Sequence, residues 1–582
     1  MPASALDRIP KGYQIFAAAI AMAQRFGLEW RASPVHHLIL SGPRPDGLAV
    51  TPKDLRPADL EAGRRIWAGG FVFSGETLTM GPRGDPWDRP APSRRFAAAL
   101  HGFGWLGDLT AQGEAGSWEA LRLTLAWRRL YGRWNVFSWS PDVLERRVFN
   151  LACSIRALSA PASQAEVDQI AGDLAYQARL LLGLQEGPCR ATERAVAAGV
   201  AGAALAGLAG EQLLERALSR LRATLRVTVT PDGGHASRSP QAALELYFDL
   251  STLDEALMQI GVTAPDEMIR AIERLAETVR FFTLADGRLA AFQGGEASPA
   301  NYVAAAGVPD AAGTRKVSGS CNGYHKLEAR ALQVIVDAAA PAAGPWSRAA
   351  CAQPLAIEVL AAGRRLIVNS GWSPSAPGPS ALRLVDAAST AAVAEAPCGE
   401  PLSGFAAKVL GPRLRDAYDV VESKRREGPG GLWLEMAHDG WSRRFGLRHE
   451  RRIYLDVETD ELRGEDRLTP LAAGGAAGRR FVPFMVRFHL HPQVSALIAR
   501  DKKSVLLKAE GQETGWWLRN DAFEVALESS IQHQDGLTRH GQQIVLRGQV
   551  RLDAGAKVRW KLSSAAYERP QVVKVDAEKV SA

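Results

Sequence analysis

Residues 484–492 read FMVRFHLHP, an alternating strand pattern that ends at a proline. Within it Phe488 and Leu490 alternate with His489 and His491, so the two histidines face the same side of one strand. The same period of two runs through the C-terminal half, whereas before about residue 300 the apolar residues recur with the period of a helix. This change of period predicts stacked helices followed by β-structure.

The helical half is indicated by apolar residues at i, i+3, i+4 and i+7 in residues 167–182, 213–225 and 268–279. Many such helices, joined by short loops and without a readable repeat length, favour an (α/α) helical toroid over a solenoid. We place this toroid at residues 96–300. Residues 1–95 contain short Pro- and Gly-rich stretches. We predict that they form an extended N-terminal segment, the lead-in, which wraps onto the larger body.

The C-terminal half, residues 301–582, is predicted to be a large antiparallel β-sandwich. Leu355, Ile357 and Val359 alternate, and residues 361–364 turn the chain into the next apolar run, which is a hairpin signal. Further strand candidates span residues 432–436, 452–457, 481–490, 504–508, 523–527, 544–550 and 558–562. The predicted fold class is therefore multidomain α+β, with the toroid before the sandwich.

Composition excludes few classes of protein. The chain of 582 residues has 46% hydrophobic and 23% charged residues, typical of a globular protein, and a net charge of +7. Its basic residues are dispersed, without a zinc-finger spacing or a ribonucleoprotein motif, so we expect no nucleic-acid partner. The basic excess suits an acidic polysaccharide or an ordinary solvated surface. The five cysteines are scattered, as reduced thiols are.

Two apolar stretches have some features of membrane or targeting segments. Residues 15–23 (IFAAAIAMA) follow two basic residues and end like a signal-peptidase site, but the run is short and has polar flanks typical of an amphipathic helix. Residues 195–210 are rich in Ala and Gly and shorter than the roughly 20 residues of a membrane span. We predict a packed core helix there and no transmembrane segment.

Several motifs, taken in order, resemble the heparinase II/III family of polysaccharide lyases, particularly a bacterial branch of it. In the helical half these are residues 101–109 (HGFGWLGDL), 231–240 (PDGGHASRSP), 281–282 (FF) and 293–295 (QGG). In the β half they are residues 320–327 (SCNGYHKL), 437–441 (AHDGW), 444–451 (RFGLRHER), 462–466 (LRGED) and 487–492 (RFHLHP). The resemblance covers roughly residues 95–565 and implies a helical toroid followed by a β-sandwich.

The resemblance also implies an activity, the cleavage of a uronate polysaccharide by β-elimination. A base removes the proton beside the carboxylate, and an acid protonates the departing glycosidic oxygen. A preorganised donor or cation must neutralise the carboxylate. The family carries a tyrosine soon after the Asp-Gly-Gly segment, a histidine in the first sandwich hairpin, and a structural metal held by His and Asp residues.

This chain departs from that pattern at the residues that carry the chemistry. Ala242 stands near the expected tyrosine, and the nearest tyrosine is Tyr247, a helical turn or more away. The hairpin segment 349–353 reads AACAQ without a histidine, Asn369 replaces the expected aspartate, and residues 387–390 read AAST. A thiol and an amide are a poor ligand set for zinc or a hard metal. We therefore expect no metal and no cofactor.

The polar residues that remain suggest a rebuilt site. His235 and Arg238 are placed where the toroid would face the sandwich, as a base and a carboxylate clamp, or with His235 merely bracing the next helix. Tyr324 and His325 lie in a glycine-containing turn at the domain junction, as an acid or base or as packing residues of that turn. The candidate catalytic residues are His235, Tyr324 and His325, and the candidate substrate-binding residues are Arg238, Trp105 and Asn322.

Other polar residues fit structural roles better. His489 and His491 belong to a proline-ended strand and are interpreted as a structural signature. His438 and His449 are interpreted as hydrogen-bond partners within the sandwich. Cys351 would be a nucleophile only beside a histidine base, and its apolar neighbours favour a buried, inert thiol.

Two functions stay open at this point. The first is a lyase, or a derivative of one, that acts on an anionic uronate-containing polysaccharide in the interdomain cleft. The second is a non-catalytic glycan-binding or cell-envelope protein on the same scaffold. Hydrolysis by paired carboxylates is disfavoured because no separated Asp/Glu pair is marked out. The resemblance implies the periplasm or cell envelope, whereas the unpaired cysteines and the ambiguous N-terminus favour the cytoplasm. None of these features bears on the oligomeric state.

Overall fold

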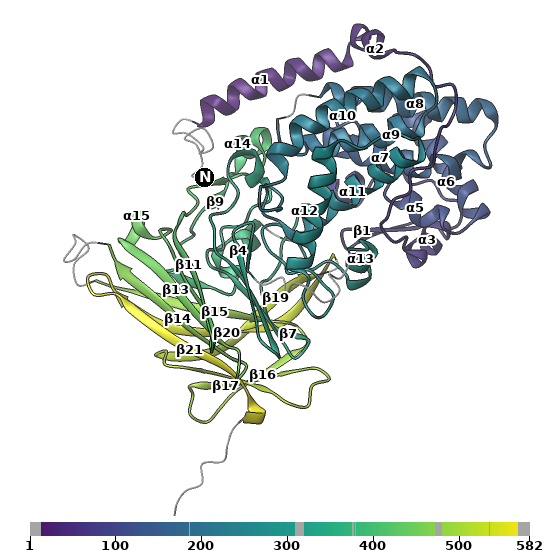
Figure 1. The fold of residues 1–582 in the computed structure, drawn as a ribbon. Coiled ribbons are helices and arrows are strands. Elements are labelled where there is room, and N and C mark those ends of the chain that lie inside the picture. The colour runs from purple at the N-terminus through teal and green to yellow at the C-terminus, as the bar shows by residue number, and fades with distance from the viewer. Residues whose placement is uncertain are drawn as a thin grey trace, which may run out of the picture.

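The computed structural model describes residues 13–184, 187–308, 319–374, 378, 380–471, 480–534 and 536–567. Helices form the N-terminal half and two large antiparallel sheets form the C-terminal half (Figure 1). The predicted fold class, a helical domain followed by a β-sandwich, is confirmed. The domain boundaries at 95 and 300 stay predictions, and no call on residues 309–318 can be compared because they lie outside the described residues.

The helical half is built around one completely buried helix, α9 (Ala191–Ala204). Its small side chains let neighbouring helices approach closely, since a Cβ on Gly202 would lie 2.7 Å from the backbone nitrogen of Leu214. The single core helix predicted at 195–210 is wrong in its length, because α9 ends at Ala204 and α10 begins at Leu208, after Gly207 at a φ of 76°. Helices α7 (Pro141–Ser159), α8 (Gln164–Gly183), α10 (Leu208–Thr228) and α11 (Pro240–Gln259) pack against α9. The other helices of this half are α3 (Leu60–Trp67), α4 (Arg94–His101), α5 (Trp105–Thr110), α6 (Glu114–Tyr131), α12 (Asp266–Phe282) and α13 (Ala300–Ala305).

The first part of the chain touches both halves of the molecule. Helix α1 (Tyr13–Ala32) packs Ala17 and Ile20 against α14 (Gly404–Leu410), which belongs to the β half. Helix α2 (Pro34–Leu40) follows, and the hairpin β1 (Gly70–Phe73) and β2 (Glu76–Thr79) packs on the helices. None of the helices in the described part of the chain is long and apolar enough to cross a bilayer.

The sandwich consists of an eight-stranded and a nine-stranded sheet. The order is β11-β12-β13-β14-β21-β18-β17-β16 in the first and β19-β20-β15-β7-β6-β5-β4-β3 in the second, where β8 also pairs with β15. The strands of the first sheet are β11 (Val420–Gly428), β12 (Gly431–His438), β13 (Leu447–Asp456), β14 (Glu461–Pro470), β16 (Val494–Ile498), β17 (Ser504–Ala509), β18 (Trp516–Asn520) and β21 (Ala556–Ser564). Those of the second are β3 (Gly319–Cys321), β4 (Tyr324–Glu328), β5 (Leu332–Asp337), β6 (Ile357–Ala361), β7 (Arg364–Val368), β8 (Ala391–Val393), β15 (Phe481–Leu490), β19 (Glu524–Gln534) and β20 (Leu537–Arg551).

Smaller elements complete the C-terminal half. The two-stranded pair β9 (Glu400–Pro401) and β10 (Leu414–Arg415) flanks α14, and α15 (Ser442–Phe445) leads into β13. The predicted hairpin is β6–β7, and its turn residues Ala362 and Gly363 both adopt positive φ, at 47° and 75°. Positive φ at both positions is what a two-residue hairpin turn requires.

The stretch that ends in Arg-Phe-His-Leu-His-Pro is β15, in the middle of the nine-stranded sheet. Phe488 points into the sandwich and meets Trp560 of the opposite sheet, with ring centroids 5.0 Å apart. His489 is buried and bonds Ser530 Oγ and the carbonyl of Asp386. The strand therefore joins the two sheets through its aromatic side and braces a loop through its histidine side.

A buried polar chain crosses the other sheet. His438 Nε2 lies 3.0 Å from His449 Nδ1, and His449 Nε2 lies 2.9 Å from Asp466 Oδ1. Arg451 donates twice to the same carboxylate, at 2.7 and 3.1 Å, and Trp560 donates to it at 2.9 Å. His438 and His449 are thus hydrogen-bond partners inside the sandwich, as the sequence predicts, and their polar atoms are satisfied.

The buried histidines predict acid instability. Burial, together with nearby arginines, lowers the pKa of His101, His489 and His491 from 6.5 to about 4. These rings stay neutral in the folded protein but take up protons in the unfolded chain. The stability they contribute is complete above about pH 6.5 and is lost as the pH falls toward 4, by up to about 3 kcal/mol each. Thermal unfolding measured across this range should show the loss.

Two substitutions test the source of that loss. His489→Asn should make the fall of Tm between about pH 6.5 and 4 shallower, because one suppressed protonation is removed. His540→Asn, on the exposed side of β20, should leave the slope as in the parent protein. Identical slopes for the parent and the His489→Asn variant would contradict the assignment.

Candidate functional site

The two motifs that supply most candidate residues face each other across the domain junction. Asn322, in the β3–β4 turn, donates its backbone N–H to Asp232 Oδ2 at 2.6 Å and its side-chain amide to the carbonyl of His235 at 2.9 Å. Gly234 makes room for this contact, because a Cβ there would lie 2.1 Å from Asn322 Cγ. Asn322 itself holds φ at 50°, a conformation that Asn tolerates. Its side chain is therefore used to lock the helical domain to the sandwich.

Arg238 is the centre of this junction. Its guanidinium donates to the carboxylate of Asp337 at 2.6 Å and lies over the Tyr324 ring, 4.6 Å from the centroid. It also donates to four backbone carbonyls of the sandwich, those of Asn322, Gly323, Ala339 and Ala340. Only 8% of Arg238 is exposed. Five hydrogen bonds match its five donors, so the side chain is saturated by the protein itself.

Tyr324 is fully buried beside the same arginine. Its ring packs edge-on against Phe282 and is tilted against Phe292, with centroids 4.9 and 5.2 Å away, and its hydroxyl donates to the carbonyl of Arg238 at 2.9 Å. Burial raises the pKa of the Tyr324 phenol well above its usual range. The geometry favours a packing role over proton transfer to a ligand.

His235 is 4% exposed and meets the edge of Trp346. Its Nδ1 lies 2.7 Å from Ser237 Oγ, and its Nε2 makes no hydrogen bond within the described residues but lies 3.8 Å from the carboxylate of Glu193. Burial would raise the pKa of Glu193, yet His235 and Arg190 lower it to about 2. A buried imidazole beside an ionised carboxylate is the one base–carboxylate pair that the candidate residues form.

His235 stands at the end of a chain of ion pairs that runs through the helical domain. Glu193 neighbours Arg190, which bonds Glu145 at 2.6 Å. Glu145 bonds Arg146 at 2.8 Å, and Arg146 bonds Asp249 at 2.5 Å. Asp249 and Glu245 share Arg56 of the lead-in segment, at 2.7 and 2.8 Å. Each of these arginines is therefore matched by a carboxylate of the same chain of ion pairs.

Two candidates lie elsewhere. His325 points away from the junction toward β11, where its Nε2 lies 3.0 Å from Ser423 Oγ, and burial and Arg425 lower its pKa to about 4. Trp105 is 1% exposed, donates its indole N–H to the carbonyl of Leu100, and packs against Phe71 and Phe103. The structure thus brings together four of the six candidates and gives Trp105 no surface for a ligand. Their roles in binding or catalysis stay predictions.

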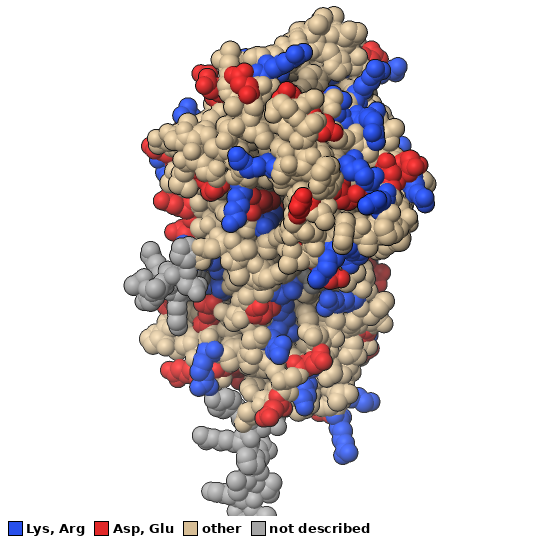
Figure 2. Space-filling view, turned by 90° about the vertical axis from the view of Figure 1, so that its right-hand side faces the viewer, with Lys and Arg blue, Asp and Glu red and all other residues tan. Residues whose placement is uncertain are grey.

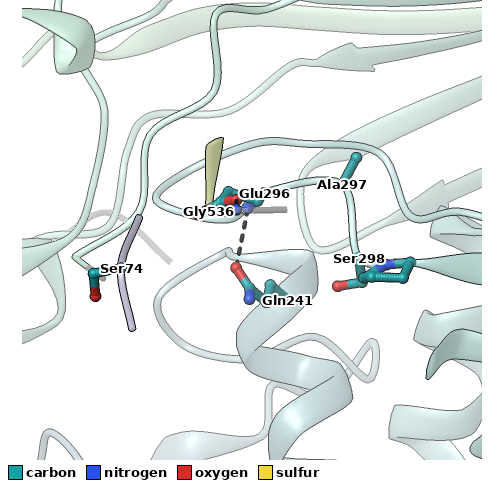
Figure 3. Close-up of a pocket in the computed structure, with 7 residues that line it drawn as sticks. Ser74, Gln241, Glu296, Ala297, Ser298 and Gly536 are labelled. Atoms are coloured by element: carbon teal, nitrogen blue, oxygen red, sulfur yellow. Dashed lines mark hydrogen bonds between the residues drawn. The ribbon is translucent and has the colours of Figure 1, made fainter. Parts of the chain in front are cut away.

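A small hollow opens near the junction and is about 260 Å³ in volume (Figure 3). Gln241 and Glu296 face each other in it, since the Gln241 amide oxygen accepts the backbone N–H of Glu296 at 3.0 Å. The Glu296 carboxylate accepts from Ser373 Oγ at 2.8 Å and from the N–H of Gly536 at 3.0 Å. Ser298 Oγ is buried there without a hydrogen-bond partner among the described residues.

A second hollow of about 1170 Å³ adjoins the first at Pro299. It is lined by residues 51–61 and by residues of α5, α7, α11 and α13. Six acidic and three basic side chains line it, namely Asp54, Asp59, Glu61, Asp108, Glu245 and Glu255 against Lys53, Arg56 and Arg146. Both arginines belong to the chain of ion pairs described above. Because acidic side chains outnumber basic ones, the net charge of the side chains that line the hollow is negative. Burial raises the pKa of Asp108 to about 6.

No sequence motif singles out Gln241 or Glu296, although each directly adjoins a motif quoted above. Gln241 directly follows residues 231–240, and Glu296 directly follows residues 293–295. That adjacency was the available signal. The sequence does not predict that the two segments meet, because they are joined by a hydrogen bond that forms only in the folded chain.

The segments that replace the metal motif are buried and internally bonded. Burial raises the pKa of the Cys351 thiol to about 11, and its backbone N–H donates to Gln293. Asn369 accepts the backbone N–H of Ser389 at 3.0 Å. Across the ranges that the structure describes, no group of three or more His, Cys, Asp and Glu side chains is arranged to hold a metal ion.

Comparison with known proteins gives four findings. A family model described as "Heparinase II/III-like, C-terminal" matches residues 312–563. The chain is 51% identical over 541 residues to FtsZ-localized protein C of Caulobacter vibrioides, covering 92% of this chain and 94% of that protein. The crystal structure of heparinase III has a TM-score of 0.68 at 14% identity, over 94% of this chain and 91% of that one. A mutant of the heparan sulfate lyase HepC from Pedobacter heparinus has a TM-score of 0.56 at 14% identity, over 88% and 86%.

The junction predicts a structural role for Arg238. Arg238→Ala should lower stability by about 3–5 kcal/mol, because it leaves Asp337 buried beside unpaired carbonyls. Arg238→Lys should restore little, because an ammonium cannot reproduce the planar fork. Denaturant unfolding measures the effect, with the exposed Arg226→Ala as the control. An Arg238→Ala protein as stable as the parent would contradict this role and return Arg238 to the ligand-binding candidates.

Proposed function

Because the chain belongs to the heparinase II/III-like family but surrounds its hollows with acidic and internally paired side chains, we propose that it is a non-catalytic member that binds at FtsZ assemblies. In this role the toroid and sandwich serve as a rigid scaffold. The proposal develops the second of the two functions that the sequence left open. In this role the protein lies where FtsZ assembles, and not in the periplasm that the resemblance implies.

The sign of the charge in the larger hollow carries the argument against a lyase. A lyase must bring an anionic uronate to a base and neutralise its carboxylate with a cation or donor. Arg56 and Arg146 are the guanidinium groups that line the hollow, and each is neutralised by a carboxylate within 2.8 Å. With acidic side chains in excess, this surface repels a polyanion rather than attracting it. Figure 2 adds that charges of both signs are interspersed on the face it shows.

The partner is inferred from the relative. FtsZ-localized protein C matches this chain over nearly its whole length at 51% identity, whereas the solved lyases share 14%. Identity at that level supports a shared role far more strongly than a shared fold does. We therefore take the relative's location, and not the lyases' substrates, as the guide to this chain.

A second candidate function is a lyase with a rebuilt site acting on an anionic polysaccharide. The observation in its favour is the unpaired Nε2 of His235 beside Glu193, an arrangement that suits a general base. In this candidate Arg238, Asn322 and Trp105 would contact the sugar, and Tyr324 or His325 would supply the acid. Their burial and internal hydrogen bonds place this candidate second.

The proposed role predicts that the protein associates with FtsZ. Purified protein should sediment with assembled FtsZ of Caulobacter vibrioides and stay in the supernatant without it. Heparinase III, which shares the fold, is the matched control and should stay in the supernatant in both cases. Equal sedimentation of the two proteins, or none of either, would overturn the proposed role.

The second prediction is the absence of β-elimination. Incubation with heparin, heparan sulfate and chondroitin should give no ultraviolet absorbance from an unsaturated uronate, while heparinase III gives a strong signal. A signal that scales with the protein and falls at least about 100-fold in a stably folded His235→Gln variant would establish the second candidate instead.

A further inference from the structure

The outer face of the eight-stranded sheet carries an unusual row of side chains. Directly paired residues across five neighbouring strands are Trp433, Tyr454, Arg463, Lys561 and Arg519, in that order. The row begins with two aromatic rings and continues with three cations. The middle strands of the row, β13, β14 and β21, lie side by side in Figure 1.

Three cations in register are costly within a sheet. Side chains directly opposite each other lie about 5 Å apart, and like charges in that position destabilise the pairing. Arg463 and Lys561 share one carboxylate, that of Glu461, which lies 2.7 Å from Lys561 Nζ. Two cations on one carboxylate leave an excess of positive charge, on a surface where Arg463 is more than half exposed.

The adjacent row shows that this excess is not a general property of the face. Its directly paired residues are Lys424, Glu435, Arg452, Glu465 and Arg559. Here the charges alternate strictly, and Arg559 bonds Glu465 at 3.0 Å. The sheet can thus neutralise one row of charges across its strands, and two residues away on the same face it leaves the next row unbalanced.

The row lines an open groove of about 570 Å³. Trp433 is 50% exposed, and its ring lies 4.1 Å from that of Tyr454 at an interplanar angle of 33°. Tyr454 is held in place because its hydroxyl donates to the carbonyl of Gly430 at 3.1 Å. An exposed, pre-oriented aromatic pair beside arginines has the composition of a binding hot spot.

We propose that this row is a docking surface for an extended acidic segment of a partner protein. An apolar side chain of the segment would rest on Trp433 and Tyr454, and its carboxylates would meet Arg463, Lys561 and Arg519. The groove crosses strands about 4.8 Å apart, so its aromatic and cationic ends are about 10–15 Å from each other. An extended peptide covers that distance with about four residues. The inference does not depend on which protein is the partner.

The carboxylates around the row favour a peptide over a uniform polyanion. A sulfated glycan or a nucleic acid carries charge at every step and would face Glu435, Glu461 and Glu465 as well as the cations. A peptide can place its carboxylates only where the three cations lie. Charge complementarity therefore selects an occupant with an apolar end and an acidic end.

Binding of designed probes tests the docking surface. The probe is a labelled extended peptide with one tryptophan followed by glutamates. A control peptide has glutamine at every glutamate position. Fluorescence anisotropy should show binding of the acidic probe alone, weakened by added salt. Arg463→Gln with Lys561→Gln should weaken it at least about tenfold, and so should Trp433→Ala. All variants are checked for unchanged thermal unfolding.

The same two strands supply a matched control. Arg467 and Lys557 are also directly paired on this face of β14 and β21, four residues from Arg463 and Lys561. Arg467→Gln with Lys557→Gln makes the same charge change and should leave binding within about twofold. Equal loss in both double variants, or no binding by the parent protein, overturns the proposal. So does tighter binding of heparin at the same residues, which would make the occupant a glycan.

Discussion

Arg238 is the contact on which the arrangement of the two halves depends. It leaves the helical domain just before α11 and places all five of its N–H donors on the sandwich, one on Asp337 and the others on backbone carbonyls. A buried guanidinium is tolerated only with a carboxylate and complete hydrogen bonding, so the residues around it are constrained as well. Gly234, Asn322 and Tyr324 all take positions that this contact requires.

The same constraint explains why residues that resemble a catalytic set are arranged differently here. In a lyase, a base and a cation must remain available to the sugar. In this chain the arginine of the junction is saturated by the protein, the tyrosine is enclosed by phenylalanines, and His235 is buried 3.8 Å from Glu193, at the end of a chain of ion pairs that extends to Arg56. Polar groups that could act on a ligand act on the fold instead, which leaves binding to the outer surfaces.

One of those surfaces is set by strand register. The row from Trp433 to Arg519 exists because five strands pair so that these residues lie directly opposite one another. A shift by one residue in any strand would turn its member of the row into the core. Two sets of contacts on the buried face of the sheet hold that register. They are the buried polar chain from His438 to Arg451 and the contact of Phe488 with Trp560.

The order of the two halves, the β6–β7 hairpin and the strand around Phe488 can be predicted from the sequence, because they depend on periodicity and turn chemistry that a short segment carries alone. The sequence also marks residues 231–240 and 320–327, which the structure brings together. The enclosure of Arg238 and Tyr324, the place of Trp105 in the core and the contact of Gln241 with Glu296 are seen only in the folded chain. Burial, ion pairing and cross-strand register arise between segments far apart in the chain, and no local pattern records them.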